Sequence, residues 1–176
     1  MLKLLLAAAA ALAVSGAARA EVIDASPAGF EVRQIVVIDA PAAKVWAALI
    51  QPGQWWSSAH TYSGDAHNLT LEAKAGGCWC EALPGGGGVQ HMRVVYVDPG
   101  KGMRAYGGLG PFQFTGAAGH LQWTLAEKDG KTTLTQTYDI GGYVKGGIQA
   151  LAAPVDHVMT EQIGRLKALV ETGKAG

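Results

Sequence analysis

The stretch from Gly76 to Pro111 constrains the fold most, because it predicts three strands in succession with no room for a helix between them. The breaks between these strands are the glycine-rich segment Pro84–Gly88 and the turn Asp98–Gly100. Parallel strands need a long crossover connection, whereas strands joined by short turns pair antiparallel. The stretch therefore predicts a curved antiparallel sheet.

Further strands are predicted on both sides of this stretch. Asp129-Gly130 is the strongest short hairpin signal in the sequence, and it joins predicted strands at 119–127 and 131–140. The sheet is thus expected to have about six or seven strands. The remaining predicted strands are rich in β-branched or aromatic residues and are Phe30–Asp39, Leu69–Lys74, Cys78–Leu83, Val89–Val97 and Gly102–Gly108.

Short helices are predicted after the first of these strands. Pro41 is favoured at a helix start, and Ala42–Ile50 places its large apolar residues on one face. Pro52–Trp56 is compatible with a further turn. The segment Ser57–Asn68 is dense in small and polar residues and is expected to form a loop.

A long helix is predicted at the C-terminal end, over Gly146–Glu171, because apolar residues recur there at helical spacing. Pro154 either kinks this helix or marks its true start, and Gly173 ends it. The order of elements predicts an α+β fold in which the sheet wraps around this helix. Such an arrangement leaves a cavity suited to a small apolar ligand.

The N-terminal segment Met1–Ala20 has the features of a secretory signal peptide. Lys3 precedes the apolar run Leu4–Val14, and Ala18-Arg19-Ala20 is a small-x-small cleavage pattern. The apolar run is well short of the roughly 20 residues that span a bilayer. We therefore expect cleavage after Ala20 and a periplasmic or secreted product.

The remaining chain, residues 21–176, is expected to be a single domain with its core over 30–171. Removal of Lys3 and Arg19 leaves 12 of the 14 basic residues against 14 acidic ones, a formal charge of −2. This charge provides no basic footprint for nucleic acid. No later segment is long and apolar enough to predict a membrane anchor, and the sequence does not indicate an oligomeric state.

Four segments carry a resemblance to a known family: Ala40–Leu49, Gly76–Glu81, Val97–Gly100 and the approach to the last helix from Thr137 to Tyr143. Together they resemble the SRPBCC superfamily, the START-like or birch-pollen-allergen-like helix-grip proteins. This superfamily includes polyketide cyclases and activators of a heat-shock chaperone ATPase. The resemblance covers residues 30 to 171.

The resemblance implies a sheet that grips the C-terminal helix around a hydrophobic pocket. It leaves function open, because related members bind lipids, sterols or hormones, close aromatic rings, or act as chaperone partners. The chaperone-activator role is disfavoured by the predicted export, because its partner is cytosolic.

Glu81 and His91 are the candidate catalytic residues. They lie at the same distance from Gly86, so a turn of three or five residues would place them opposite each other on one face of a hairpin. A carboxylate can fix a histidine tautomer and make it a base near neutral pH. The alternative is a surface ion pair near the hairpin tip.

Cys78 and Cys80 are separated only by Trp79. Residues i and i+2 of an extended strand are too far apart for a disulfide, so pairing would require a distorted strand. We expect buried thiols that behave as small apolar residues. A copper(I) site with His91 or Met92 is the alternative.

Other polar candidates have weaker patterns. His60, Asp65 and His67 have the chemistry of metal ligands, but their spacing matches no motif, and a mobile loop over the pocket mouth is the expected role. Arg93 and Arg104 either contribute a cation to the pocket or cover the outer face of the sheet.

The expected pocket walls are aromatic. Trp79, Trp123 and Tyr138 lie in predicted strands and would line a ligand site together with Glu81 and His91, although core packing explains them nearly as well. Gln136 shares the strand face of Tyr138, where a buried amide needs a partner or a ligand.

No cofactor or metal is predicted. The glycine-rich patch lacks the lysine and hydroxyl residue of a phosphate loop, and both the Gly-x-Ser-x-Gly and His-Glu-x-x-His motifs are missing. Three hypotheses remain. The first is an exported binder of a small hydrophobic or aromatic molecule. The second is a cyclase, dehydratase or hydrolase that uses Glu81 and His91, and the third is a protein-interaction module.

Overall fold

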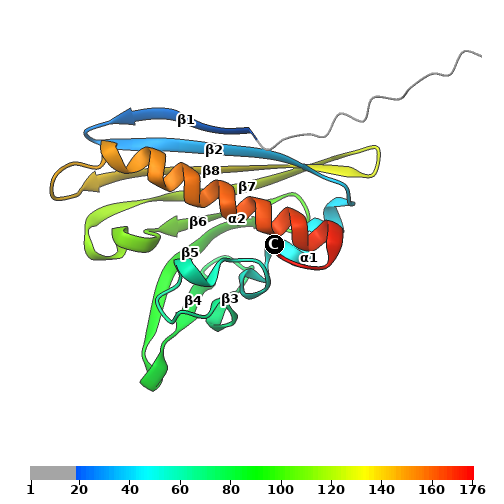
Figure 1. Ribbon diagram of the computed structural model, residues 1–176, viewed down its shortest axis with the longest axis horizontal. Helices are drawn as coiled ribbons and strands as arrows, with labels where there is room; N and C mark the ends of the chain where they lie inside the picture. Colours follow the sequence, from blue (N-terminus) through cyan, green and yellow to red (C-terminus); the bar gives the residue numbers. More distant parts are fainter. Residues whose placement is uncertain (1–18) are drawn as a thin grey trace, which may run out of the picture.

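The computed structural model describes residues 19–176, and they form one curved antiparallel sheet closed on one face by a helix (Figure 1). Most of the predicted signal peptide lies outside the described residues. The strands lie in the order β1-β2-β8-β7-β6-β5-β4-β3. Their bounds are β1 Arg19–Ser26, β2 Gly29–Ile38, β3 Leu69–Leu71, β4 Cys78–Ala82, β5 Gly88–Asp98, β6 Gly102–Gly107, β7 Gly116–Lys128 and β8 Lys131–Tyr143.

Two α-helices accompany the sheet. The short helix α1 (Ala42–Leu49) follows β2, and the long helix α2 (Ala152–Thr172) crosses the concave face (Figure 1). Six short 3-10 segments lie in the connections: η1 Pro52–Gln54, η2 Ser58–His60, η3 Ala66–Asn68, η4 Pro84–Gly86, η5 Gly110–Phe114 and η6 Gln149–Leu151. The predicted α+β helix-grip fold is confirmed. No helix among the described residues is both long and apolar enough to span a bilayer.

The sheet has one strand more than the predicted six or seven, and that strand is β1. It pairs with β2 from Arg19↔Ile35 to Ser26↔Gly29. The sequence analysis missed it because these residues follow the apolar N-terminal run and show no clean alternation. The predicted cleavage after Ala20 would remove the first two residues of the strand and leave its other pairs intact.

Pro154 marks the start of the long helix. Helix α2 begins at Ala152, which places Pro154 in the first turn, where a missing backbone N–H breaks no helical hydrogen bond. Gly173 ends the helix in a left-handed conformation (φ 80°), and its N–H donates to the Leu169 carbonyl oxygen at 2.8 Å. Helix α2 presents a continuous apolar face to the sheet, formed by Met159, Ile163, Leu166 and Val170.

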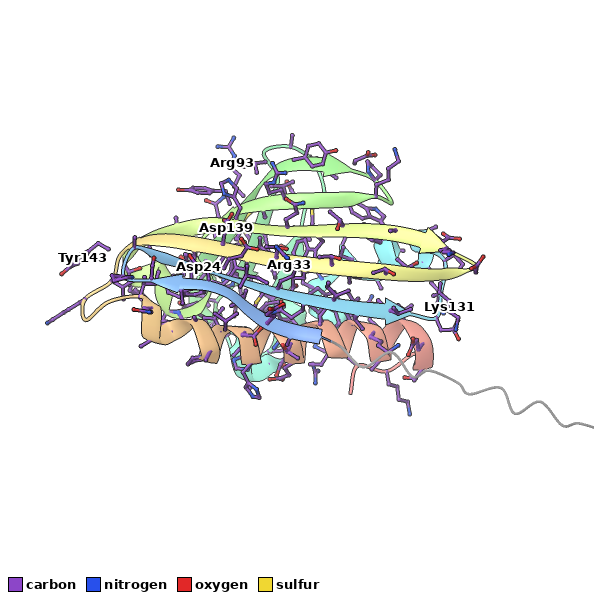
Figure 2. The ribbon with its side chains drawn as sticks, turned by 90° about the horizontal axis from the view of Figure 1, so that it is seen from above. Asp24, Arg33, Arg93, Lys131, Asp139 and Tyr143 are labelled. Atoms are coloured by element: carbon purple, nitrogen blue, oxygen red, sulfur yellow. A yellow bond between two sulfur atoms is a disulfide. The ribbon has the colours of Figure 1, made fainter. Side chains whose placement is uncertain are left out.

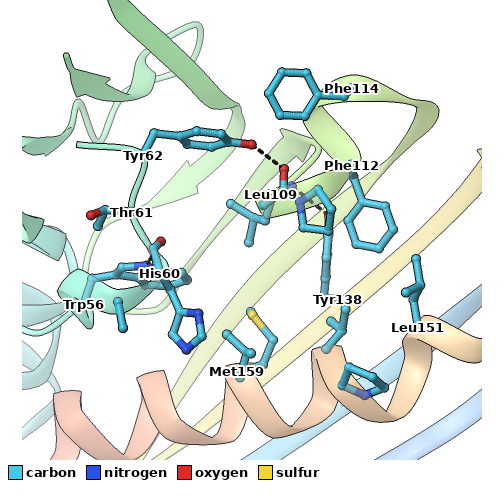
Figure 3. Close-up of a pocket in the computed structure, with 16 residues that line it drawn as sticks. Trp56, His60, Thr61, Tyr62, Leu109, Phe112, Phe114, Tyr138, Leu151 and Met159 are labelled. Atoms are coloured by element: carbon cyan, nitrogen blue, oxygen red, sulfur yellow. Dashed lines mark hydrogen bonds between the residues drawn. The ribbon is translucent and has the colours of Figure 1, made fainter. Parts of the chain in front are cut away.

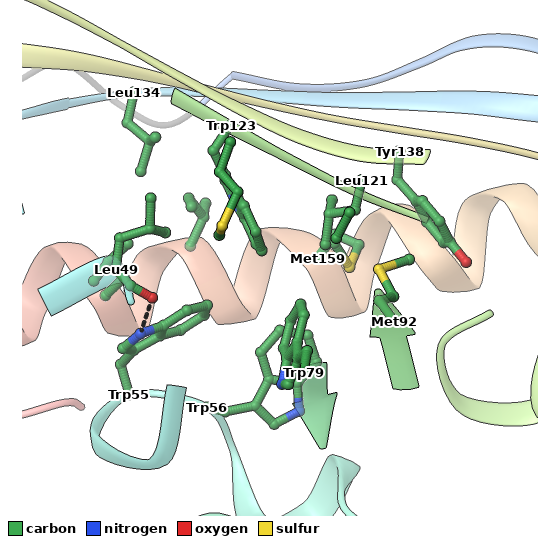
Figure 4. Packing of buried hydrophobic residues seen from close by; sticks show 14 of the residues in the cluster. Leu49, Trp55, Trp56, Trp79, Met92, Leu121, Trp123, Leu134, Tyr138 and Met159 are labelled. Atoms are coloured by element: carbon green, nitrogen blue, oxygen red, sulfur yellow. Dashed lines mark hydrogen bonds between the residues drawn. The ribbon is translucent and has the colours of Figure 1, made fainter. Parts of the chain in front are cut away.

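The core between sheet and helix is built around packed aromatic rings (Figure 4). Trp79 lies between Trp56 and Trp123, with ring centroids 5.1 Å and 5.6 Å away. All three side chains are buried. Rings at these distances add to stability beyond the area they bury.

A chain of buried hydrogen bonds crosses this core. Gln136 accepts from Trp123 Nε1 at 2.7 Å and donates to Gln34 Oε1 at 3.0 Å and to the Met159 carbonyl oxygen at 3.3 Å. Gln34 in turn donates to Asp156 on α2 at 2.6 Å. The Gln136 amide therefore has the protein partners that its buried position demands.

The opposite face of the sheet carries charged residues together with exposed apolar ones. Arg33 and Asp139 extend from it, on the side away from α2 (Figure 2). Arg93 and Arg104 are exposed, and the Arg104 guanidinium lies 5.8 Å from the centre of the Tyr96 ring. Of the two predicted alternatives for these arginines, the structure shows that they cover the outer face of the sheet and do not contribute a cation to the pocket.

Candidate ligand-binding site

A pocket of about 540 Å³ lies between α2, the loop that contains η2 and the segment that contains η5 (Figure 3). Its volume is in the range of sites that hold drug-sized molecules. Trp56, Phe112, Tyr138 and Met159 are buried and form its floor. Its rim is partly exposed and mainly apolar, and includes Ala59, Phe114, Pro154, Val155 and Val158.

Helix α2 supplies one wall. Leu151, at the end of η6, and then Pro154, Val155, Val158 and Met159 recur three or four positions apart and therefore share one face. This is the N-terminal half of the apolar face whose C-terminal half packs against the sheet. Its side chains line the pocket.

The opposite wall is the segment Leu109–Phe114. The Gln113 amide fixes it by donating to the carbonyl oxygens of Gln90, His91 and Gly108. Phe112 packs against Phe30 with ring centroids 6.1 Å apart. Phe114, in contrast, is 81% exposed at the rim.

The loop over 57–68 closes the pocket on the third side, in the position predicted for it. The Tyr62 hydroxyl donates to the Gly110 carbonyl oxygen at 2.6 Å, and the Tyr62 and Phe114 rings lie 5.9 Å apart (Figure 3). At the other end of the loop, Ser57 N–H donates to Gln162 of α2 at 2.7 Å. The loop thus bridges the two other walls.

Glu81 and His91 form a buried hydrogen-bonded pair directly behind this loop. His91 Nε2 lies 2.9 Å from Glu81 Oε2, and both side chains are buried. The Glu81 carboxylate also accepts from the backbone N–H groups of Tyr62 (3.2 Å) and Ser63 (2.5 Å). Glu81 therefore ties the loop to β4.

The two residues meet for a different reason from the one predicted. The hairpin connection is centred on Gly85, so Glu81 pairs with Val89 and not with His91. A β-bulge lies next to this pair: Trp79 opposes Met92 whereas Cys80 opposes Gln90, so that His91 is the extra residue. The bulge lets two consecutive side chains, His91 and Met92, both point inward.

The electrostatics of the site follow from burial and hydrogen bonding. Burial alone would raise the pKa of Glu81, but the hydrogen bonds from Ser63, Tyr62 and His91 outweigh it and lower that pKa. Burial raises the pKa of Tyr138, so its hydroxyl stays protonated. Burial also raises the pKa of Tyr62, with a smaller contribution from the Glu81 charge.

The predicted site residues separate into three groups. Tyr138 lines the pocket. Trp79, Trp123 and Gln136 lie in the core behind it, and Glu81 and His91 lie behind Tyr62, whose ring is 5.8 Å from that of His91. The pair is thus one side chain away from the pocket.

Sequence reasoning missed the pocket residues of α2 and of Leu109–Phe114. The sequence of α2 did contain a signal for its pocket residues, because the helix has more apolar residues than packing against the sheet requires. Pro111 and Phe114 gave no such signal, since a loop carries no periodicity.

The prediction of free buried thiols is wrong. Cys78 and Cys80 form a disulfide, and both are half-buried whereas Trp79 between them is buried. The bulge beside Cys80 supplies the distortion that pairing requires, and the two Cα atoms lie only 5.4 Å apart. Paired sulfurs are not thiolate ligands, which also removes the basis of the copper(I) alternative.

The polar loop residues do not form a metal centre. His60 lies 3.2 Å from Glu161 of α2, and His67 lies 2.9 Å from Asp65. Across residues 19–176, no group of three or more potential ligands is placed to hold a metal ion.

The lowered pKa of Glu81 predicts an acid-sensitive contribution to stability. A carboxyl group with a depressed folded-state pKa stabilises the protein fully above its unfolded-state pKa of about 4.3, and loses that contribution as the pH falls through the folded-state value. We expect the free energy of unfolding of the wild type relative to Glu81→Gln to be constant from about pH 7 to about pH 5 and to fall below that. Urea denaturation across this range measures it. Glu72→Gln, at an exposed position, is the control, and a difference that does not change with pH would contradict the prediction.

Comparison with known proteins assigns the family. The chain belongs to the family described as polyketide cyclase / dehydrase and lipid transport, whose model matches residues 29–171. The match spans β2 to α2, the elements that form the pocket walls. No curated protein sequence matches the chain.

Solved structures share the fold. A conserved protein of unknown function from Enterococcus faecalis is 16% identical with a TM-score of 0.62, and the match covers 90% of this chain and 80% of that one. A putative protein of the dynemicin biosynthetic locus is 25% identical with a TM-score of 0.57. That match covers 82% of this chain but 48% of the other, so this chain spans about half of its length.

Proposed function

We propose that the protein is an exported carrier that binds a small hydrophobic or aromatic molecule in the pocket between α2, the 57–68 loop and Leu109–Phe114. The observation that supports this most is the pocket itself, whose buried floor is aromatic and aliphatic. Burial of a ligand against such surface is favourable by about 25 cal/mol per Å² of apolar area. The family description, which includes lipid transport, is consistent with this role.

The main support for export comes from the sequence. The N-terminal segment has the pattern of a signal peptide. The Cys78–Cys80 disulfide supports export further, since such bonds persist in oxidising compartments.

A cyclase or dehydratase is the second candidate, and the Glu81–His91 hydrogen bond favours it. The pair has the arrangement of an oriented general base. It is placed second because Tyr62 lies between His91 and the pocket. His91→Ala distinguishes the two functions: turnover of a ligand would be lost with little change in affinity if the pair is catalytic.

Native mass spectrometry of the protein purified from its own host tests binding directly. We expect a bound apolar molecule, which denaturing extraction releases for identification. Val158→Trp, which places an indole in the pocket, should reduce retention at least about tenfold, since a ligand and a bulky side chain compete for the same volume. Ala153→Trp, on an exposed position of the same helix, is the matched control. Equal retention by both variants would contradict a ligand site at this pocket.

A further inference from the structure

Tyr138 places a buried hydroxyl on the pocket wall. Its side chain is fully buried by the protein, and its oxygen accepts a hydrogen bond from Leu109 N–H at 3.2 Å. A tyrosine hydroxyl can also donate one hydrogen bond. Within residues 19–176, the Tyr138 hydroxyl proton has no acceptor.

The other polar side chains of the pocket are already engaged. The Tyr62 hydroxyl donates to the Gly110 carbonyl oxygen, the Thr61 hydroxyl donates to the Ser58 carbonyl oxygen at 2.8 Å, and His60 Nε2 is paired with Glu161. These contacts hold the loop to its neighbours. Tyr138 is therefore the buried side chain of the pocket wall whose hydrogen-bond donor is still free to bind a ligand.

The pocket wall offers no fixed positive charge. None of its lining residues, all in the described part of the chain, is lysine or arginine, and the imidazole of His60 faces the carboxylate of Glu161. An ionised carboxylate or phosphate would lose its hydration here without gaining a cation. Burial of an unpaired charge is far more costly than burial of a neutral polar group with a hydrogen bond.

We infer that the ligand is a neutral, mainly apolar molecule with an acceptor oxygen, such as a ketone or ester carbonyl, that accepts a hydrogen bond from the Tyr138 hydroxyl. This inference rests on the proposed function and makes it more specific, because it excludes free fatty acids and other anionic lipids as preferred ligands. Tyr138 gives the ligand its orientation, and the apolar floor gives most of the affinity.

The test compares matched probes on the full chain. Fluorenone and fluorene share one ring framework and differ in a carbonyl group, so the ratio of their dissociation constants isolates the hydrogen bond. Calorimetric titration of the wild type should show fluorenone binding about three- to tenfold tighter than fluorene, the range given by one net hydrogen bond. In Tyr138→Phe this preference should disappear. Fluorene carboxylate should bind at least about tenfold more weakly than fluorenone.

The ratio of the two dissociation constants also controls for indirect effects of the substitution on the pocket. Tyr138→Phe leaves the Leu109 N–H without its acceptor, but that change affects both probes, whereas the lost donor affects fluorenone alone. Tyr106→Phe removes a hydroxyl from the exposed outer face and should preserve the preference. In the wild type, the carbonyl stretching band of bound fluorenone should lie at lower wavenumber than in an alkane solvent, and this requires no variant.

The outcomes separate the inference from the proposed function. An unchanged preference in Tyr138→Phe, equal affinity for the carboxylate, or an unshifted carbonyl band would overturn the inference while leaving the pocket as a binding site. If the wild type binds neither fluorenone nor fluorene, both the inference and the proposed function are overturned. A preference lost in Tyr138→Phe and kept in Tyr106→Phe establishes the inferred contact.

Discussion

Glu81→Ala is expected to lower the free energy of unfolding by about 3 kcal/mol. The reason is that the carboxylate is the shared acceptor for three donors: the N–H groups of Tyr62 and Ser63 and the imidazole of His91. Truncation leaves the buried His91 Nε2–H unpaired and frees the loop. Urea denaturation at neutral pH measures the loss.

The control for this variant is Glu72→Ala, whose exposed side chain pairs only with Lys74. It should change stability by less than about 0.5 kcal/mol, as exposed ion pairs do. Ligand retention provides a second measurement, because the loop that Glu81 holds also closes the pocket. If Glu81→Ala and Glu72→Ala are equally stable, the carboxylate does not hold the loop as described.

Trp123→Ala is expected to lower the free energy of unfolding by about 4 kcal/mol. The indole is fully buried, packs against Trp79, and donates to Gln136 at the centre of the buried hydrogen-bond chain. Truncation therefore opens a cavity and leaves Gln136 Oε1 without its donor.

Trp123→Phe separates these two effects. Phenylalanine keeps much of the volume but has no N–H, so the expected loss falls to about 1–2 kcal/mol, the cost of one unsatisfied buried acceptor together with a smaller packing defect. Thermal and chemical denaturation of both variants provide the comparison. Equal losses in the two variants would show that packing of the indole contributes little and the hydrogen bond most.

The helix-grip architecture was predictable because it depends on local signals that recur along the chain. The Asp129-Gly130 turn joins β7 and β8, where the hairpin was predicted, and the apolar periodicity located α2. The strand β1 was missed because its residues follow the predicted apolar N-terminal run and do not alternate between apolar and polar.

The site was harder to predict, since it depends on contacts between distant segments. Tyr138 was named as a candidate pocket wall and does line the pocket, but strand parity alone could not choose which face of its strand points inward. The meeting of Glu81 and His91 depends on a bulge, which shifts strand register by one residue and has no reliable sequence signature. The prediction that Cys78 and Cys80 are unpaired was wrong for the same reason, because it assumed a regular strand.

Helix α2 follows all eight strands of the described residues, and this order has a consequence for biosynthesis. The concave face, with Trp123, Leu134 and Tyr138, emerges from the ribosome before the segment that will cover it. Until Thr172 is available, an apolar surface of this kind is open to aggregation and to chaperones that hold unfolded chains. The nascent chain therefore cannot complete its core until the C-terminal helix has emerged.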